Sequence, residues 1–600
     1  MTQTTHERQL WNFIAQVKAG RMSRRTFVRR MVELGLTAPL ATQMLSFAGV
    51  ARAETKVDYK PSKRGGGGPL KVLLWQAPTL LNPHFAIGTK DQEASRIFHE
   101  PLAAWDPEGN LVPILAAELP DLENGTLSRD GRSVTWKIKP NVKWHDGEPL
   151  TADDVVFNWQ YAEDTATAAV TIGSYKDMSV EKIDDLTVRV QFSQPTPFWA
   201  NPFVGTRGML IPKHLFEAYK GDKSRDAPTN LKPVGTGPYK FVAFNPGDIV
   251  RGELNPEYHE NNQPYFNTIE MKGGGDAVSA ARAVLQTGEY DYAWNTQVED
   301  EILKRLEAGG KGHVLITPGG DVEHIQLNTC DPSTEIDGER SSIKTKHPLL
   351  SDTAVREALA HLVDRQSIQE YIYGRTGVAT GNFLNNPPRY RSNTAQAEFN
   401  IEKANQILDA GGWKRGADGI RAKDGKRLSL VYQTSINQPR QKTQAIVKQA
   451  CQKAGIDVEI KSVVASAFFS SDAANPDTSA HFTSDLEMYS AVMSYADPRV
   501  YMRQFLSSEV ASKANKFQGR NFTRWQNAEF DQLYEAGDCE LDPVKRAALF
   551  IAMNDLVIRN VVVIPVVARR DVTAHVNNLQ APLSGWDTNM YALQDWYRDG

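Results

Sequence analysis

Cysteine is scarce in this sequence, which has only Cys330, Cys451 and Cys539 among its 600 residues. So few cysteines exclude a disulfide-scaffolded fold, and one disulfide at most can form among the three. No C-x-x-C pair offers a zinc site, and the 12 histidines show no metal-ligand spacing. We therefore predict neither a metal nor a cofactor.

Enzyme motifs are missing as well, because the sequence contains no G-x-S-x-G, no H-E-x-x-H and no Walker loop. Asp153 and Asp154 could suggest a catalytic pair, but adjacent helical residues point about 100° apart. They suit the positive start of a helix better, with Thr151 as its cap. His145-Asp146 is best interpreted as a hydrogen-bonded turn. We predict that the chain is not an enzyme, with an exported hydrolase as a remote alternative.

The full chain is not strongly basic, and it has no long apolar run beyond its first 53 residues. The formal net charge is −4, which gives no sign of nucleic-acid binding. No run after residue 53 reaches the roughly 18 apolar residues that a membrane span requires. At 41% hydrophobic residues the composition is typical of globular proteins, and 600 residues exceed one ordinary core. We expect two to four domains or lobes.

Residues 1–53 have the pattern of an export signal. A basic segment containing Arg24-Arg25, within S-R-R-T-F-V, is similar to a twin-arginine signal, and an apolar stretch follows it. Ala51-Arg52-Ala53 then supplies a small-x-small cleavage site. We predict cleavage after about Ala53 and a soluble protein in the periplasm. An amphipathic basic helix on the folded domain is the alternative.

The rest of the chain alternates strands with helices after a glycine-rich linker at residues 54–68. This alternation predicts an α/β class with a partly parallel sheet. The expected strands are Lys71–Trp75, Val134–Lys139, Leu186–Phe192, Lys240–Phe244, His324–Leu327, Leu428–Tyr432, Ile456–Lys461 and Val561–Val567. The expected helices are Ala277–Gln286, Thr353–Val363, Ile401–Ala410, Gln441–Ala454 and Val544–Arg559.

Val134–Phe157, V-T-W-K-I-K-P-N-V-K-W-H-D-G-E-P-L-T-A-D-D-V-V-F, resembles a signature run of the extracellular solute-binding proteins, family 5. This family serves ABC importers of dipeptides, oligopeptides and related solutes. Pro233–Tyr239, P-V-G-T-G-P-Y, is similar to a second signature. Shorter similar segments follow the family order from about residue 70 to 570, at Trp105–Ala116, Gly288–Asp291, Val355–Arg365, Ala410–Trp413 and Lys453–Ile456.

The resemblance implies a two-lobed periplasmic-binding-protein fold (type II, cluster C-like) with a hinge and an additional small domain. The lobes would close over a ligand and present it to the permease subunits of an ABC importer, with the binding protein acting as a monomer. By this resemblance, lobe I comprises residues 69–90, 192–319 and 565–600, the small domain 91–191, and lobe II 320–564. The hinge strands would lie near Val322–Asn328 and Val561–Val567.

The residues that bind peptide termini in this family are replaced here. Dipeptide and oligopeptide binders carry G-W-x-x-D, whose Asp holds the peptide amine, and Ser494 stands at that position. Thr434 stands on or near the Arg that holds the carboxylate in dipeptide binders. A terminus buried without its counter-charge costs roughly several kcal/mol. A closed dipeptide cage that lacks both anchors is therefore not expected.

Other residues are candidates for ligand contact. Trp75, Gln76 and Ala77 can pair with a longer peptide as an added strand. Charged anchors for a ligand in a shifted position are possible at Arg440, Asp497 and Arg499, with a surface ion pair or a helix-start charge as the alternative. Tyr489 and Tyr495 are candidates for aromatic contacts in the cleft, with a place in the core as the alternative. We predict a peptide or peptide-like ligand. An oligosaccharide or other polar metabolite, or a sensor or chaperone role, are the alternatives.

Overall fold

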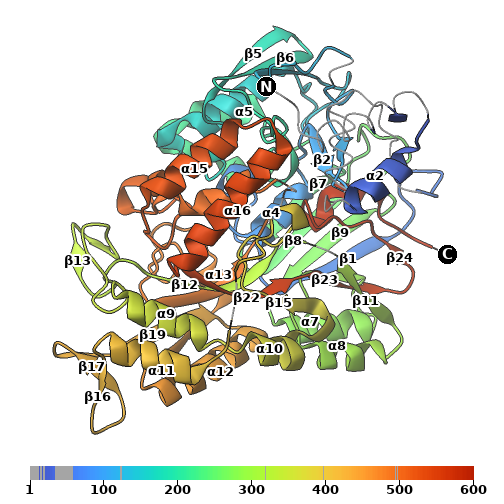
Figure 1. The fold of residues 1–600 in the computed structure, drawn as a ribbon. Helices are drawn as coiled ribbons and strands as arrows, with labels where there is room; N and C mark the ends of the chain where they lie inside the picture. Colours follow the sequence, from blue (N-terminus) through green and yellow to red (C-terminus); the bar gives the residue numbers. More distant parts are fainter. Residues whose placement is uncertain are drawn as a thin grey trace.

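The computed structural model describes residues 13, 16, 17, 21–33 and 59–599, apart from 108, 122, 123, 318, 396, 397, 494 and 496. Two large mixed sheets organise this part of the chain (Figure 1). The first has the order β11-β23-β10-β1-β9-β8-β7 and the second the order β15-β22-β12-β21-β19-β20. The small sheets β4-β6-β5 and β2-β3 belong to a third unit, whose strands β5 and β6 lie at the top of Figure 1.

The first sheet surrounds β1 (Pro69–Leu74), which pairs in parallel with β9 (Thr268–Gly273) and β10 (Tyr292–Ala293). Alternate β1 side chains, Leu70, Val72 and Leu74, enter its hydrophobic core. Helices α7 (Ala277–Leu285) and α8 (Asp300–Glu307) pack against the other side with β1 Leu73. The remaining strands are β7 (Tyr239–Asn245), β8 (Ile249–Leu254), β11 (Gly312–Thr317) and β23 (Asp571–Val576).

The second sheet surrounds β12 (Val322–Leu327), which lies antiparallel to β21 (Leu486–Ala491) and β22 (Val563–Arg569). Its remaining strands are β15 (Gly377–Ala379), β19 (Ser429–Ser435) and β20 (Asp457–Val463). Separate cores involve α9 (Thr353–His361), α11 (Ile401–Ala410) and α12 (Gln438–Ala454), and α15 (Ala528–Cys539) with α16 (Pro543–Arg559). In Figure 1 helices α15 and α16 lie above the second sheet, and helices α9, α11 and α12 lie below it.

The chain passes between the large sheets at two places that lie close together. β11 ends at Thr317 and β12 begins at Val322, while β22 ends at Arg569 and β23 begins at Asp571. Each connection is only a few residues long, so two short segments of chain join the sheets. This is the arrangement of a hinge.

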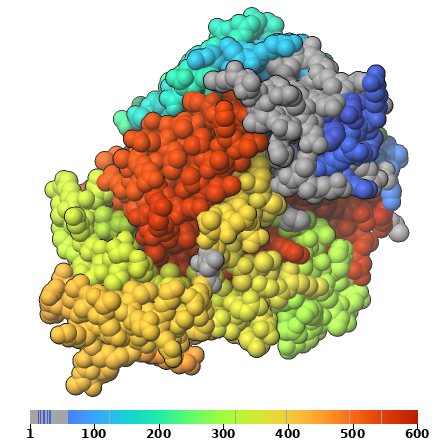
Figure 2. Space-filling model, viewed as in Figure 1, coloured from blue at the N-terminus to red at the C-terminus, as the bar shows by residue number. Residues whose placement is uncertain are grey.

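The third unit is built around buried tryptophans, including Trp105, Trp136 and Trp144. Its strands are β2 (Ala103–Trp105), β3 (Leu111–Pro113), β4 (Ser133–Lys137), β5 (Met178–Asp184) and β6 (Thr187–Phe192). Helix α5 (Ala152–Glu163) covers its small sheet, and Figure 2 shows this unit (cyan to teal) at the top of the molecule.

The two signature segments hold each other in place. The backbone N–H of Gly235 donates to His145 Nδ1 at 3.1 Å, and His145 Nε2 lies 3.0 Å from Gly237 O. Asp154 completes a capping box with Thr151 at the start of α5, and Asp153 pairs with Lys182 at 2.7 Å. The turn and helix-start predictions are confirmed, and these charged groups have structural partners.

The expected strands and helices are present with small shifts at their ends, for example at Gln438 and Val322, where α12 and β12 begin. All three cysteines are free. Among the described residues no helix is long and apolar enough to cross a membrane. Arg24 and Arg25 begin helix α2 (Arg24–Glu33), in which Phe27 and Met31 are buried. Ala51 and Ala53 lie outside the described residues.

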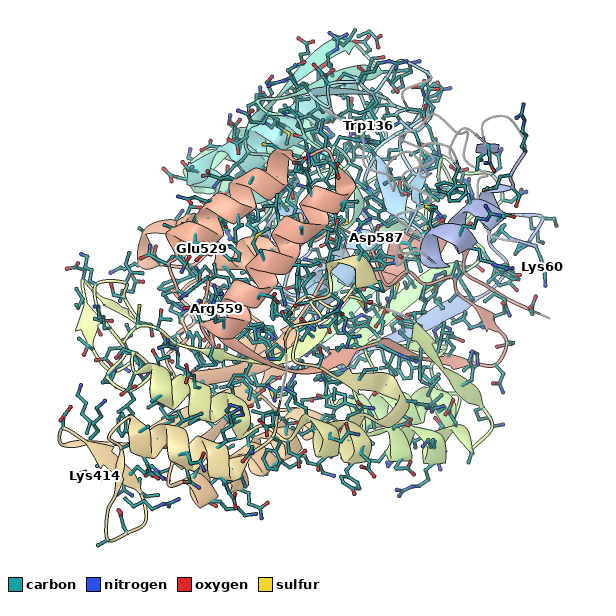
Figure 3. All side chains as sticks on the ribbon, viewed as in Figure 1. Lys60, Trp136, Lys414, Glu529, Arg559 and Asp587 are labelled. Atoms are coloured by element: carbon teal, nitrogen blue, oxygen red, sulfur yellow. The ribbon has the colours of Figure 1, made fainter. Side chains whose placement is uncertain are left out.

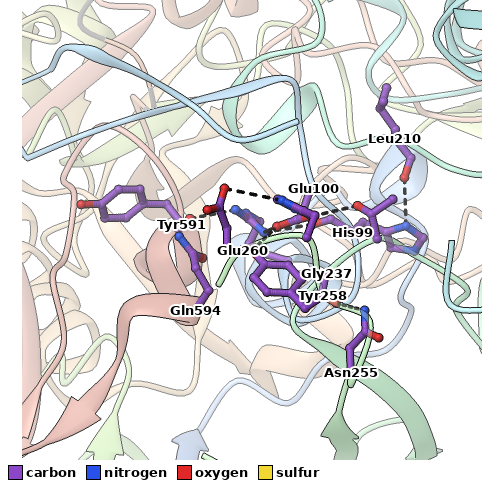
Figure 4. Close-up of polar contacts among 12 residues, drawn as sticks. His99, Glu100, Leu210, Gly237, Asn255, Tyr258, Glu260, Tyr591 and Gln594 are labelled. Atoms are coloured by element: carbon purple, nitrogen blue, oxygen red, sulfur yellow. Dashed lines mark hydrogen bonds and ion pairs between the residues drawn. The ribbon is translucent and has the colours of Figure 1, made fainter. Parts of the chain in front are cut away.

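A buried charge network ties the second signature to α4 (Thr89–Arg96) and the segment after it (Figure 4). Glu100 is fully buried and accepts hydrogen bonds from Thr236 at 2.9 Å and Tyr258 at 2.8 Å. The His259 imidazole lies 2.9 Å from the same carboxylate. Burial by itself would raise the pKa of Glu100, but His259 and its other partners lower it to about 2.

Acid is therefore expected to weaken the wild-type fold through Glu100. The contribution of the ionised Glu100 carboxylate to the free energy of unfolding is complete above the ordinary carboxyl pKa of 4.5. It is lost as pH falls from there towards 2. Between pH 5.5 and 3.5 the loss is about 1.4 kcal/mol, one pKa unit. Urea unfolding of wild type and Glu100→Gln at both pH values measures it. The difference in the free energy of unfolding between wild type and Glu100→Gln should narrow by that amount on acidification. A difference that stays constant would contradict the lowered pKa of Glu100.

Candidate functional site

A cavity of about 180 Å³ lies between the two large sheets. Residues from α4, the β12 entry, β21 and the segment after β23 line it, and Asp587 among them lies in the middle of the molecule in Figure 3. Lys414, by contrast, lies at an outer tip. Aromatic and charged side chains share the wall: Trp294, Phe469, Tyr489, Phe522, Glu93, Asp321, Asp571, Asp587, Arg207, Arg440, Arg520 and Arg569.

Segments from the two sides of the cavity contact each other. The Ser471 hydroxyl lies 3.4 Å from Asp91, and Tyr495 donates a hydrogen bond to the carbonyl of Val204 at 3.3 Å. The Tyr495 ring also enters the tryptophan core of the small domain, edge-on to Trp105. These contacts bring the walls together, so the described conformation is a closed one.

A buried ion cluster connects the lobes at the hinge. Glu323 on β12 binds Arg440 through two hydrogen bonds of 3.0 Å and lies 3.3 Å from Arg569. From the first lobe, Gln297 donates to Glu323 at 2.6 Å, and Asn295 accepts from Arg569 at 2.6 Å. Burial would raise the pKa of Glu323, but Arg440 and Arg569 outweigh it and lower the pKa below its ordinary value. Both arginines are therefore structurally committed to Glu323.

The cavity also contains carboxyl groups that ionise with difficulty. Burial raises the pKa of Glu93 to about 8, although the backbone N–H groups of Asn589 and Met590 donate to it at 2.8 and 3.0 Å. Burial likewise raises the pKa of Asp321 to about 7 and that of Asp587 to about 6. A cation placed beside these groups would favour their ionised form, because opposite charge lowers a carboxyl pKa.

Three of the residues expected to contact ligand line the main cavity: Gln76, Arg440 and Tyr489. Tyr495 and Asp497 line a smaller neighbouring cavity. Asp497 is paired with buried Arg546, and Arg499 is paired with Asp538. These last two charges therefore already have partners within the protein.

Those of the other expected contacts that the structure describes lie outside both cavities. Trp75 donates to the carbonyl of Asn295 at 2.7 Å, beside the hinge cluster, and Ala77 is buried next to it in sequence. Thr434 is fully buried, and its hydroxyl donates to the carbonyl of Met488 at 2.6 Å. Ser494 lies outside the described residues.

Sequence reasoning missed the cavity carboxylates and two cavity arginines, Arg207 and Arg520. Arg207 ends the turn Gly205–Arg207, and Arg520 precedes Asn521 in a loop. Neither belongs to a motif, and more than three hundred residues of chain separate them. No sequence signal marks them as neighbours of one cavity.

Two lobes joined by two short connections, with a cavity between them that charged and aromatic side chains line, define a solute-binding protein. The model for bacterial extracellular solute-binding proteins, family 5 (Middle), matches residues 110–513, and the chain belongs to this family. Among the described residues no group of three or more His, Cys, Asp or Glu could hold a metal ion.

Three known proteins illustrate the similarity. The oligopeptide-binding protein AppA of Bacillus subtilis is 28% identical over 442 residues, 72% of this chain and 76% of AppA. Its structure with a nonapeptide superposes with a TM-score of 0.76 at 24% identity, covering 90% of this chain and all of AppA (100%). The glutathione-binding protein GsiB of Shigella boydii is 25% identical over 509 residues, 84% and 89% of the two chains. NikZ of Campylobacter jejuni, solved with Ni(L-His), gives a TM-score of 0.74 at 20% identity over 88% and 99%.

Proposed function

We propose that this protein captures a short peptide or peptide-like solute in the periplasm and delivers it to the permease of an ABC importer. The observation that carries the proposal is the closed cavity with charged groups of both signs on its wall. A peptide with free termini has a cation and an anion that such a wall can complement. The names of AppA and GsiB, which bind an oligopeptide and glutathione, support this ligand class.

The size of the cavity favours a small ligand. Its volume is about 180 Å³. Drug-sized ligands occupy pockets of roughly 300–1,000 Å³. A ligand of a few residues therefore fits this closed conformation better than a long peptide, for which the lobes would have to stand further apart.

The ligand contacts proposed from the expected set are Gln76, Arg440 and Tyr489, because their side chains line the cavity. Tyr489 offers a ring face for an apolar or peptide group. Arg440 donates to Glu323 through two nitrogens and to Ser435 through the third, so it offers a ligand only the N–H groups that these bonds leave over. The proposed lobes are residues 69–90, 192–319 and 565–600 for lobe I and 320–564 for lobe II, with the small domain at 91–191. The membership of the three groups of strands supports this division.

Export is part of the same proposal. Residues 1–53, with Arg24-Arg25 and the Ala51-Arg52-Ala53 site, would direct the chain through the twin-arginine route. Cleavage removes a leader of charge +6, with eight basic and two acidic residues, so the mature chain carries −10. The described end of the segment 54–68 lies against lobe I, where the Arg64 guanidinium donates to the carbonyls of Tyr258 at 2.6 Å and Glu260 at 2.7 Å, and it leads into β1.

Ligand extraction tests this proposal. The mature chain, which starts at Glu54 after export, is purified without refolding. It is then denatured, and the small molecules that it releases are identified by mass spectrometry. Peptides of a few residues are expected, because tight ligands dissociate slowly and survive purification. A single sugar, or another solute without a peptide bond, would contradict the ligand class and leave the binding-protein fold in place.

A further inference from the structure

Two arginines face the cavity without a carboxylate partner. Arg207 lines both the main cavity and its smaller neighbour, and its guanidinium donates to the backbone carbonyl of Val170 at 3.3 Å. Arg520 lines the same two cavities and has no side-chain hydrogen bond or ion pair to any residue that the structure describes. This sets them apart from Arg440 and Arg569, which Glu323 neutralises.

The surroundings do not neutralise Arg207 and Arg520. Burial, followed by repulsion from Arg207, lowers the pKa of Arg520 to about 9. The carboxylate that acts on both, Glu509, is already hydrogen-bonded to Arg503 and lies 3.8 Å from Lys176. Four cations therefore share one carboxylate at this end of the cleft. Half-buried guanidinium groups in this situation destabilise the unliganded protein, because their charges are neither fully hydrated nor paired.

The two arginines come from opposite sides of the cleft. Arg207 follows Val204, which forms a bridge to Ala103 in the small-domain core. Arg520 lies two residues before Phe522, which packs with Tyr489 on the second large sheet. An anion held by both would therefore join the two lobes.

We propose that Arg207 and Arg520 together bind an anionic group of the ligand, such as the carboxylate of a peptide C-terminus, and that this contact helps to hold the lobes closed. Guanidinium groups suit this task, because their planar N–H pairs match carboxylate and phosphate oxygens. The proposal rests on the proposed function and adds a position for the ligand's negative charge. It also differs from the Arg position expected in dipeptide binders, where this chain has buried Thr434.

The test measures the thermal midpoint of the ligand-stripped mature chain with trialanine, trialaninamide or sodium phosphate, each against sodium chloride at equal ionic strength. Binding to the folded state raises the midpoint. Wild type is compared with Arg520→Gln, Arg207→Gln and the exposed control Arg391→Gln. We expect trialanine to raise the midpoint more than its amide, and calorimetry to show at least tenfold weaker trialanine binding in both cavity variants. The control Arg391→Gln should match wild type both in the shift of its thermal midpoint and in its affinity for trialanine.

The unliganded variants provide a second readout. Removing an unpaired cation should leave the unliganded midpoint unchanged or raise it, whereas a structural arginine would lower it. Equal effects of trialanine and its amide, with no change in the cavity variants, would overturn the anion site and leave peptide binding standing. Phosphate binding that disappears in Arg520→Gln, without any peptide binding, would support the anion site and contradict the proposed function. If no probe raises the wild-type midpoint, the anion site is overturned.

Discussion

Replacing Glu323 by Gln is expected to lower the free energy of unfolding by about 3–5 kcal/mol. The side chain is fully buried and is bound to both Arg440 and Arg569. Without its charge the two guanidinium groups remain in the interior with little compensation. Equilibrium unfolding in urea, read by fluorescence, measures the loss.

The control for this substitution is Glu301→Gln. Glu301 forms an exposed ion pair with Lys304 at 2.7 Å, and a pair of this kind contributes about 1 kcal/mol or less. Adding Arg440→Met to Glu323→Gln removes one of the stranded cations and should restore part of the stability. A loss from Glu323→Gln no larger than that from Glu301→Gln would contradict the hinge cluster described here.

Replacing Gly235 by Ala is expected to destabilise the fold by roughly 3 kcal/mol, the upper end for overpacking. An added Cβ would lie 1.8 Å from the backbone oxygen of Phe98 and 2.5 Å from its carbonyl carbon. Because these are backbone atoms, no side-chain rotation relieves the clash. Ligand affinity per folded molecule should change little, since Gly235 lies outside the cavity and serves the His145 turn.

Gly88→Ala is the matched control. Its new Cβ would meet only ordinary contacts at 3.5 Å, and its backbone φ of −83° suits alanine. Thermal unfolding of the two variants side by side measures the difference. If Gly235→Ala unfolds at the temperature of Gly88→Ala, the second signature does not have the structural role that its contacts indicate.

Much of the fold could be predicted from the sequence because its determinants are local. Thr151 and Asp154 lie three residues apart, so their capping box is visible in sequence. The alternation in Val134–Lys139 likewise anticipated β4. What the sequence did not indicate is that Pro233–Tyr239 packs on His145, some ninety residues earlier, because that contact depends on tertiary structure.

The site was predicted less completely for the same reason. Gln76 and Arg440 were found because they flank an expected strand and an expected helix, and Tyr489 because it is an aromatic residue next to the segment compared with G-W-x-x-D. Asp497 and Arg499 also looked like displaced anchors, but their partners Arg546 and Asp538 lie some forty to fifty residues away and could not be read from spacing. Arg207 and Arg520 line the same cavities only because the lobes close, and no sequence motif indicates which residues closure brings together.

The most direct test of the account is small-angle X-ray scattering of the ligand-stripped mature chain, with and without the ligand recovered from it. Ligand capture by hinge closure predicts a smaller radius of gyration once calorimetry shows that the site is saturated. Identical scattering of the empty and saturated protein would contradict capture by closure of the two lobes.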